Sequence, residues 1–359
     1  MPDSSPQLHI QQDVPLAPYT TFGIGGPARY FLSVTDAAQL APALVWARSQ
    51  GVPVLVLGGG SNLLVSDSGF AGLVLHMAMC SPIRLHAVGG AVETTVDAGV
   101  LWDDLVLAVC QHGLSGVECL AGIPGTVGGT PVQNVGAYGQ EVAETILAVH
   151  ALDTATLETV TLPTSACGFS YRRSIFNTTQ QGRYVVTQVT FRFDPAARPS
   201  LRYADLARHF AAQVAMGSSP TPLEVYHAVR EIRHAKGMLL VPGEADCRSA
   251  GSFFKNPVVP VATLHAVAAG LGLAEDDVPH WPAGAGAVKL PAAWLLERAG
   301  FHKGYSLHNA GISSRHTLAL INRGGATAQE VVALRQMICA TVLHRFGIQL
   351  EQEPVAVGF

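Results

Sequence analysis

The sequence predicts an α+β fold in which a larger, two-part N-terminal region precedes a smaller α/β domain. Two glycine-rich loops in the first half of the chain, and strand-like sequence over residues 145–162 and 183–193, indicate the larger region. After a change of composition at residues 195–199, Thr221-Pro222-Leu223-Glu224 starts a helix with a capping box and a proline at its first position. We therefore expect a domain boundary near residues 215–220.

The composition describes a globular protein of two or three domains. Of the 359 residues, 48% are hydrophobic and 13% are charged, and the formal net charge of −4 gives no electrostatic footprint for nucleic acid. The six cysteines lack metal-ligand spacing, which is typical of small core residues in a reducing compartment. Met1–Tyr19 shows no signal-peptide pattern, and no window approaches the roughly 18 apolar residues of a membrane helix. We expect a monomeric cytoplasmic protein with no metal, membrane or nucleic-acid partner.

The first glycine-rich loop follows an apolar strand at Val54–Leu57 and consists of Gly58, Gly59, Gly60, Ser61 and Asn62. Glycines let backbone N–H groups turn toward one anion and let that anion come close, because no Cβ stands in the way. A GxGxxG fingerprint and a Walker lysine are both missing from this loop, so a Rossmann site is disfavoured. A tight turn between two buried strands is an equal alternative for such a loop alone.

The second glycine-rich loop runs from Ala121 to Gly139 and contains six glycines. A segment with so little apolar surface depends for its order on something that it wraps. Together, the two loops indicate a long, phosphate-bearing cofactor.

Periodicity and capping signals predict the remaining elements. We expect strands at 29–34, 70–76, 91–96 and 317–322, and helices at 36–50, 101–112, 288–299 and 327–346. Thr35 can cap the first of these helices, which would complete a βαβ unit. The helix after Thr221 should carry Arg233 and Lys236 on one face near its C-terminal end. Residues 278–286 have the composition of a flexible surface loop, and a short turn of helix is expected around Tyr171 and Arg172.

Over nearly its full length, the chain resembles the UDP-N-acetylenolpyruvoylglucosamine reductase family. The resemblance is carried by the order and spacing of TFGIGG at 21–26, the GGGSN loop, GIPG at 122–125, QNVGAYG at 133–139, YRRS at 171–174, GSFFKNP at 251–257 and VKL at 288–290. It implies the two-subdomain FAD-binding fold of the vanillyl-alcohol-oxidase/MurB type. It also implies non-covalent FAD, NADPH as the hydride donor, and reduction of UDP-N-acetylglucosamine enolpyruvate to UDP-N-acetylmuramate in peptidoglycan precursor synthesis.

The resemblance also divides the chain. It places FAD-binding subdomains at 1–80 and 81–218, a substrate-binding domain at 219–347, and a C-terminal segment at 348–359 that returns to the flavin site. The implied flavin-binding residues are those of the first glycine loop together with Gly122, Ile123, Pro124, Gly125, Thr126, Gly128 and Ile175.

Reduction of an enol ether requires a hydride donor, a stabilising cation and an acid, and the resemblance assigns the last two. Ser252 would protonate carbon, although a serine that caps a turn is the commoner role of a Gly-Ser pair. Arg172, selected over Arg173 by the family pattern Tyr-Arg-x-Ser, would stabilise the developing negative charge. Glu353 would be a second acid or would orient Ser252. Here the chain departs from the family, because proline follows this glutamate and Glu351 is a rival two residues away.

Six further residues are candidates for binding the sugar nucleotide. They are Tyr171, Tyr203, Arg233, Lys236, Asn256 and His316. A solvent-exposed role is the alternative for Arg233, Lys236, Asn256 and His316, and an ordinary aromatic at a helix start is the alternative for Tyr203. Lys236 and Arg233 offer cations to a diphosphate, and Tyr203 resembles the residue of the tyrosine-loop subclass that closes over the substrate.

Two other functions compete with the reductase. An FAD-dependent alcohol oxidase would share such glycine loops, but neither loop contains a histidine that could tether flavin, and Cys119 lacks a supporting signature. A non-catalytic flavoprotein that relays electrons to a partner would not need the Ser252 segment or Lys236.

Overall fold

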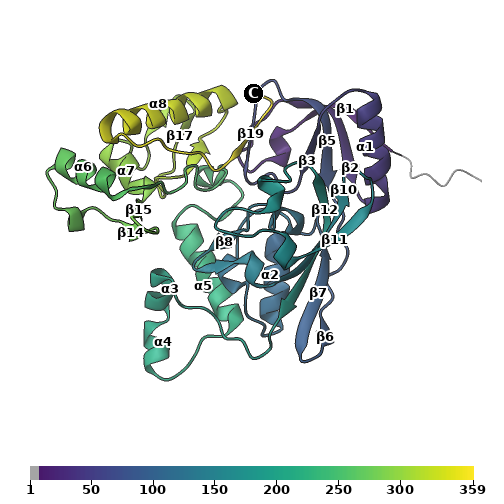
Figure 1. The fold of residues 1–359 in the computed structure, drawn as a ribbon, viewed down its shortest axis with the longest axis horizontal. Coiled ribbons are helices and arrows are strands. Elements are labelled where there is room, and N and C mark those ends of the chain that lie inside the picture. The colour runs from purple at the N-terminus through teal and green to yellow at the C-terminus, as the bar shows by residue number, and fades with distance from the viewer. Residues whose placement is uncertain (1–7) are drawn as a thin grey trace, which may run out of the picture. The chain divides into compact units, whose positions relative to one another are not determined.

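The computed structural model describes residues 8–359, so the expectation for Met1–Tyr19 falls partly outside the described residues (Figure 1). The chain forms two compact units. The first unit contains the residues up to Val14 with Ala28–Gly60 and Phe70–Ala235, and the second contains Pro15–Pro27, Ser61–Gly69 and Lys236–Phe359. Within residues 8–359, none of the helices is long and apolar enough to span a bilayer.

The first sheet has four strands in the order β1-β2-β5-β3, which are β1 (Gln11–Pro15), β2 (Pro27–Val34), β5 (Phe70–Met77) and β3 (Val54–Leu57). Both β2 and β3 run parallel to β5. The expected βαβ unit is therefore confirmed in direction, but β5 lies between its two strands. The connecting helix is divided into a 3-10 turn, Ala37–Gln39, and α1 (Leu40–Ser49). Asp36, and not Thr35, caps the turn, because its carboxylate accepts the N–H of Ala38 at 2.8 Å.

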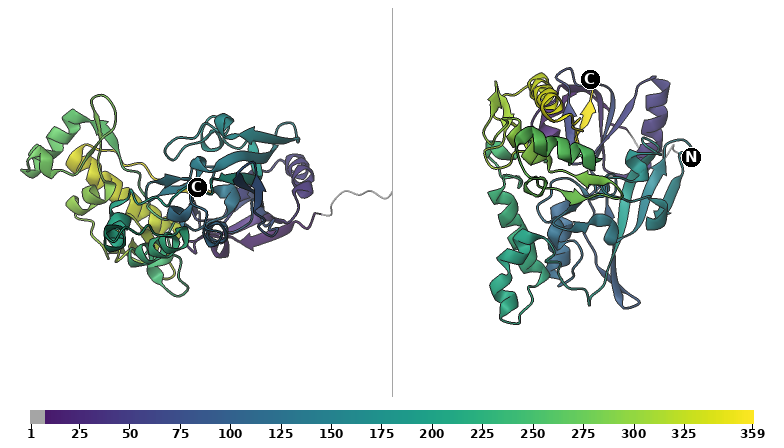
Figure 2. Two further views of the ribbon diagram at one scale, coloured as in Figure 1. Left: turned by 90° about the horizontal axis from the view of Figure 1, so that it is seen from below. Right: turned by 60° about the vertical axis from the view of Figure 1, so that its left-hand side comes forward.

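The second sheet of the first unit is antiparallel, with the order β11-β10-β12-β7-β6. Its strands are β11 (Thr159–Pro163), β10 (Ile146–Asp153), β12 (Tyr184–Phe193), β7 (Ala91–Asp97) and β6 (His86–Val88). One face packs against α2 (Trp102–Gln111) and α5 (Pro222–Ala235), and side chains of β10 and β12 share another cluster with α1, β2 and β5. Both Figure 1 and Figure 2 show these strands between α1 and α5.

The helix α5 belongs to the core of the first unit. Its capping box is confirmed, since Thr221 N–H donates to Glu224 and the N–H of Glu224 donates to Thr221 Oγ1. Buried Val225 and Val229 pack with α2, so the compact units divide after Ala235 and not near residue 218. The functional division of the chain into four ranges stays a prediction. Shorter elements of this unit are β8 (Gly136–Ala137), β9 (Gln140–Glu141), α3 (Ala204–His209) and α4 (Ala211–Ala215).

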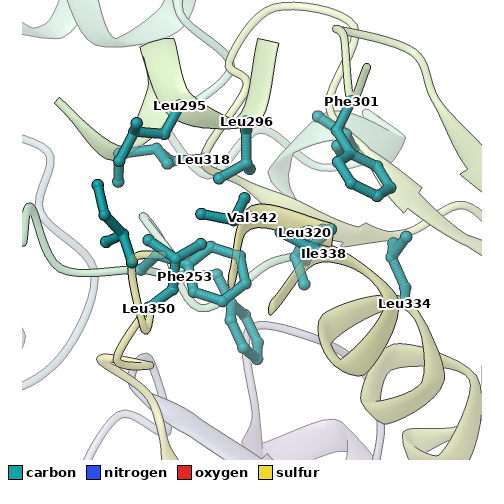
Figure 3. Packing of buried hydrophobic residues seen from close by; sticks show 14 of the residues in the cluster. Phe253, Leu295, Leu296, Phe301, Leu318, Leu320, Leu334, Ile338, Val342 and Leu350 are labelled. Atoms are coloured by element: carbon teal, nitrogen blue, oxygen red, sulfur yellow. The ribbon is translucent and has the colours of Figure 1, made fainter. Parts of the chain in front are cut away.

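The second unit has its own core, in which Phe253, Leu318 and Leu350 pack with Ile338 and Val342 (Figure 3). Its small sheets are β13-β15-β14, β16-β17-β18 and the parallel pair β19-β4. The strands are β13 (Val258–Pro260), β15 (Ala287–Lys289), β14 (Trp281–Pro282), β16 (Ser306–Leu307), β17 (Ala310–Ile312), β18 (Leu320–Asn322), β19 (Val355–Val357) and β4 (Leu63–Val65). The helices are α6 (Val261–Leu271), α7 (Ala292–Arg298) and α8 (Ala328–Phe346).

One expectation for this unit is wrong, and a second is confirmed only in part. Residues 288–299 do not form one helix, because β15 pairs with β13 and β14 and the chain becomes helical only after Pro291. Residues 278–286 lie at the surface as expected, apart from buried Val278, but they are not simply a loop, because β14 lies within them. The capping box of Thr327 and Glu330 at α8 is confirmed.

Candidate active site

The two glycine-rich loops meet within the first unit. A Cβ on Gly59 would lie 2.6 Å from the Cα of Gly125, and a Cβ on Gly58 would lie 2.7 Å from Thr126 Oγ1. The contact at Gly59 is with backbone atoms and is too short for any real Cβ, so the approach of the two backbones requires glycine at that position, whereas a Cβ on Gly58 would have to displace the Thr126 hydroxyl. The loops that the sequence predicted as phosphate-binding segments are therefore adjacent.

The residues at this junction fit a phosphate-bearing cofactor. Thr126 Oγ1 is buried and makes no hydrogen bond to any of the described residues, although buried hydroxyls are normally paired. Gly60 and Gly125 have φ values of 58° and 127°, which favour glycine and help to turn backbone N–H groups outward. A phosphate oxygen near Thr126 would satisfy its hydroxyl.

Arg172 has an unusual backbone conformation, and its side chain binds the hairpin β8–β9. Its φ is 58°, so the expected helical turn is wrong; the residue lies in a tight turn closed by Ser170 and Arg173. Its Nη1 donates to the carbonyl of Gly136 at 2.8 Å, and its own carbonyl accepts from Asn177 Nδ2 at 3.1 Å. Positive φ in a bulky residue costs free energy, and its presence at a half-buried arginine supports a functional role.

Tyr171, which precedes Arg172, is 53% exposed, and its ring lies 5.4 Å from the guanidinium carbon of Arg172. Ile175 lies half-buried at the start of the next 3-10 turn, Ile175–Asn177, which Ser174 caps. Tyr171 is thus exposed at one end of the YRRS segment. At the other end, the Ser174 hydroxyl donates to the carbonyl of Val132 at 2.5 Å.

Ser252 lies half-buried in the second unit, beside two phenylalanines that are almost fully buried. Phe253 N–H donates to the carbonyl of Leu318 at 2.8 Å, which fixes the main chain next to Ser252. The adjacent turn at Gly251 is capped by Ser249, whose Oγ accepts the N–H of Gly251 at 3.2 Å. Because Ser249 caps this turn, the turn-capping alternative for Ser252 loses its main support.

The C-terminal segment pairs with the Ser252 segment and favours Glu353 over Glu351. Glu353 N–H donates to the carbonyl of Phe253 at 2.9 Å, and Asn62 Nδ2 donates to the carbonyl of Glu353 at 3.4 Å. Glu353 is half-buried. Glu351 is instead an exposed residue whose carboxylate forms an ion pair with Lys255. The assignment of Glu353 as the site glutamate stays a prediction that this geometry supports.

Only one of the two cations predicted to share a helix face lies within the helix. The helix α5 ends at Ala235, so half-buried Lys236 lies beyond it. Arg233 is only 7% exposed, and its Nε donates to the carbonyl of Gly122 at 3.2 Å. Burial lowers the pKa of Arg233, and its side chain has little contact with bulk solvent. Its Nε therefore supports the second glycine loop, and its contact with a diphosphate stays a prediction.

The other substrate candidates have identifiable local contacts. Tyr203 is 40% exposed at the start of α3, and its ring packs edge-on against Tyr138 at a centroid distance of 4.9 Å. Asn256 Oδ1 accepts the N–H of Ala292 at 2.9 Å and so caps α7. His316 Nδ1 accepts the N–H of Leu318 at 3.1 Å. In the neutral ring this places the proton on Nε2, which is then the ring donor.

Comparison with known proteins identifies the family. The family described as UDP-N-acetylenolpyruvoylglucosamine reductase, C-terminal domain, matches residues 242–357, and an FAD binding domain family matches residues 28–162. The UDP-N-acetylenolpyruvoylglucosamine reductase of Thermobifida fusca is 46% identical over 353 residues, which cover 97% of this chain and 98% of that protein. The chain belongs to the UDP-N-acetylenolpyruvoylglucosamine reductase family.

Two further members of the reductase family agree with this assignment. The enzyme of that name from Streptomyces coelicolor is 47% identical over 98% of this chain and 90% of its own length. The crystal structure of UDP-N-acetylenolpyruvylglucosamine reductase (MurB) from Thermus caldophilus is 25% identical, covers 98% of this chain and 99% of its own, and superposes with a TM-score of 0.63. The expected family and the expected FAD-binding fold are both confirmed.

Two residues of this reductase-family chain support the site and were missed from sequence. Glu118 is fully buried and accepts from Gly116 N–H, Gln140 Nε2 and Ser200 N–H at 2.6, 2.8 and 3.1 Å. Asn134, also buried, donates to Glu141 at 2.6 Å and to the carbonyl of Ser170 at 3.1 Å. Asn134 belongs to the QNVGAYG motif, so the motif could have drawn attention to it, whereas nothing local marks Glu118.

Proposed function

We propose that this chain is an FAD-containing, NADPH-dependent reductase that converts UDP-N-acetylglucosamine enolpyruvate to UDP-N-acetylmuramate. The observation that carries this proposal is the 46% identity to a reductase of that name along 97% of the chain, which includes both compact units. A match to the FAD binding domain alone would also suit an alcohol oxidase or an electron-relaying subunit. The reaction supplies a precursor for peptidoglycan synthesis. A monomeric, cytoplasmic enzyme stays the expectation from sequence.

The adjoining glycine loops are the residues that would hold FAD. Gly58–Gly60 and Gly125–Thr126 provide close backbone approach and a buried hydroxyl in need of a partner. The first loop continues into Ser61 and Asn62, which add side-chain donors. When bound, FAD accepts a hydride from NADPH and supplies it to one carbon of the enol ether.

Ser252 is the residue that we assign to proton delivery. Hydride addition to one carbon of the double bond leaves negative charge on the other carbon, and that carbon takes a proton from the serine hydroxyl. Serine is a weak acid, so its alkoxide needs stabilisation or rapid reprotonation. Glu353, whose main chain hydrogen bonds to Phe253, is the candidate for orienting Ser252 or returning its proton.

Arg172 is the residue that we assign to charge stabilisation. A guanidinium keeps its positive charge at any working pH and binds a carboxylate in a fixed geometry. The guanidinium of Arg172 donates to the carbonyl of Gly136, and the carbonyl of Arg172 accepts from Asn177. Because these bonds already position the arginine, little reorganisation is needed when charge develops on the substrate.

For the rest of the sugar nucleotide, we propose that Lys236 contacts the diphosphate and that Tyr203 closes over the bound substrate. Tyr171, Asn256 and His316 are further binding candidates. The exposed Tyr203 ring at the start of a short helix supports a role that requires movement. Arg233 stays a binding candidate as well, and its Nε donates to the carbonyl of Gly122.

The decisive test of the proposed function uses flavin colour. Anaerobic addition of NADPH should bleach the yellow protein, and subsequent addition of the enolpyruvyl sugar nucleotide should restore the colour. A protein that bleaches but does not recolour with this substrate would contradict the proposed reaction. A protein that does not bind FAD would contradict the cofactor as well.

Ser252→Ala tests the assigned acid. Flavin reduction by NADPH should stay near normal, because that half-reaction protonates no carbon, while reoxidation by the sugar nucleotide should slow by about 10²–10⁴-fold. Ser249→Ala is the matched control, since Ser249 caps the neighbouring turn and should cost stability without slowing either half-reaction. Equal slowing of both half-reactions in Ser252→Ala would show that Ser252 is not the acid.

A further inference from the structure

Both backbone polar groups of Gly122, at the start of the second glycine loop, are bound by side chains. Its N–H donates to Asp103 Oδ1 at 2.6 Å, and its carbonyl accepts from Arg233 Nε at 3.2 Å. The φ of Gly122 is 65°, in the left-handed region that favours glycine. Asp103 lies on α2 and Arg233 lies on α5, so two helices fix the conformation of this one residue.

Asp103 is the centre of this arrangement. Its Oδ2 accepts from the hydroxyl of Tyr226 at 3.1 Å and forms an ion pair with Arg230, both of which belong to α5. Burial, followed by the negative charge of Asp103, raises the pKa of Tyr226 to about 12, so this tyrosine remains a donor throughout the working pH range. A single carboxylate thus joins α2, α5 and the glycine loop.

The first turn of α2 also binds the main chain on both sides of Gly122. Trp102 N–H donates to the carbonyl of Gly125 at 3.1 Å, and Trp102 Nε1 donates to the carbonyl of Leu120 at 3.0 Å. Gly125 is the residue whose Cα lies against Gly59 of the first glycine loop. A shift of Gly122 would therefore be transmitted over three residues to the junction of the two loops.

We infer that Asp103 is a positioning residue for flavin binding: through Gly122 it sets the conformation in which the second glycine loop meets the cofactor phosphates. This inference rests on the proposed function. It assigns no contact between Asp103 and the flavin. The acceptor atom Oδ1 is the part that matters for the loop, while Oδ2 serves the contact between the helices.

The experiment compares Asp103→Ala, Asp103→Asn and Asp104→Ala as holoproteins. Asp104 is the matched control, because it is exposed and lies in the same first turn of α2. Each protein is diluted in steps, and the rise of free-flavin fluorescence gives the FAD dissociation constant, while circular dichroism records folding and the melting temperature. Asparagine keeps an oxygen that can accept the N–H of Gly122 but loses the charge that pairs with Arg230.

We expect Asp103→Ala to bind FAD at least about tenfold more weakly than wild type, the scale of one hydrogen bond to a charged group. Asp103→Asn should recover most of that affinity even if its melting temperature falls, and Asp104→Ala should match wild type. An Asp103→Ala protein with wild-type affinity, or an Asp103→Asn protein as weak as the alanine variant, would overturn the inference. If Asp103→Ala does not fold, Asp103→Asn is compared with wild type instead: an affinity within about tenfold of wild type is expected, and a larger loss would overturn the inference. A wild-type protein without FAD would overturn the proposed function and this inference with it, whereas wild-type binding with unaffected variants would overturn only the inference.

Discussion

Replacement of Gly59 by alanine tests whether contact between the two glycine loops is required for flavin binding. The new Cβ would lie 2.6 Å from the Cα of Gly125 and 3.0 Å from its carbonyl carbon. Both are backbone atoms, so no side-chain rotation can relieve the overlap. A shift of about 0.8 Å would bring the nearer pair to 3.4 Å, where ordinary contact begins.

The cost of that shift can be bracketed. Added methyl groups in well-packed sites typically cost about 1–3 kcal/mol, and replacement of glycine by alanine returns about 0.4–1 kcal/mol by restricting the unfolded chain. A net loss of about 1–2 kcal/mol follows. Expressed as stability, it corresponds to a melting temperature lower by a few degrees. Expressed as binding, it corresponds to an FAD affinity weaker by about 5–30-fold.

The assay measures flavin dissociation and thermal melting of Gly59→Ala beside Gly129→Ala. Gly129 belongs to the second loop, but a Cβ there would meet no atom within 4 Å. Gly129→Ala should therefore keep both its FAD affinity and its melting temperature. Gly58→Ala provides a further comparison. Its new Cβ would meet only the Thr126 hydroxyl, which a side-chain rotation can move. A Gly59→Ala protein that matches Gly129→Ala in both measurements would refute the claim that loop contact supports flavin binding.

Three other expectations concern the cofactor, the substrate and the glutamate. Acid precipitation should release FAD into the supernatant, because neither glycine loop carries a tethering histidine or cysteine; flavin in the pellet would contradict this. Lys236→Ala should weaken the apparent affinity for the sugar nucleotide more than it slows reoxidation, since a diphosphate contact far from the reacting carbon stabilises ground and transition states equally. An unchanged affinity would exclude Lys236. Glu353→Gln should slow reoxidation while Glu351→Gln leaves it near normal, and the opposite result would exchange their roles.

Elements marked by local chemistry were predictable from sequence. The strand at Val54–Leu57 agrees with the structure at both ends. The capping boxes at Thr221 and Thr327 each place a hydroxyl three residues before a glutamate, and both start helices where expected. These signals succeed because the interacting groups lie within one turn of each other. The same is true of the glycine loops, whose conformation depends on the missing Cβ.

Elements decided by distant partners were not predictable in this way. Residues 288–299 carry apolar side chains at helical spacing, yet Val288 pairs with Val259 in β13 and the helix starts later. Arg172 lies in a tight turn closed by Ser170 and Arg173, and its side chain and carbonyl bind Gly136 and Asn177 outside the YRRS segment. In both places the chain pairs with residues that local periodicity cannot identify.

Arg233 shows how far the fold can change the meaning of a residue. Near the C-terminal end of a helix, an arginine three positions before a lysine is typical of a solvated cationic face. In this chain the helix packs against α2, and the guanidinium is directed to the carbonyl of Gly122 in the interior of the first unit. The nearby carboxylate of Asp103 also contributes to keeping that guanidinium charged, against the effect of burial. The positive charge that sequence assigned to a substrate diphosphate therefore also supports the loop for which we propose cofactor binding, and Arg233 stays a substrate-binding candidate.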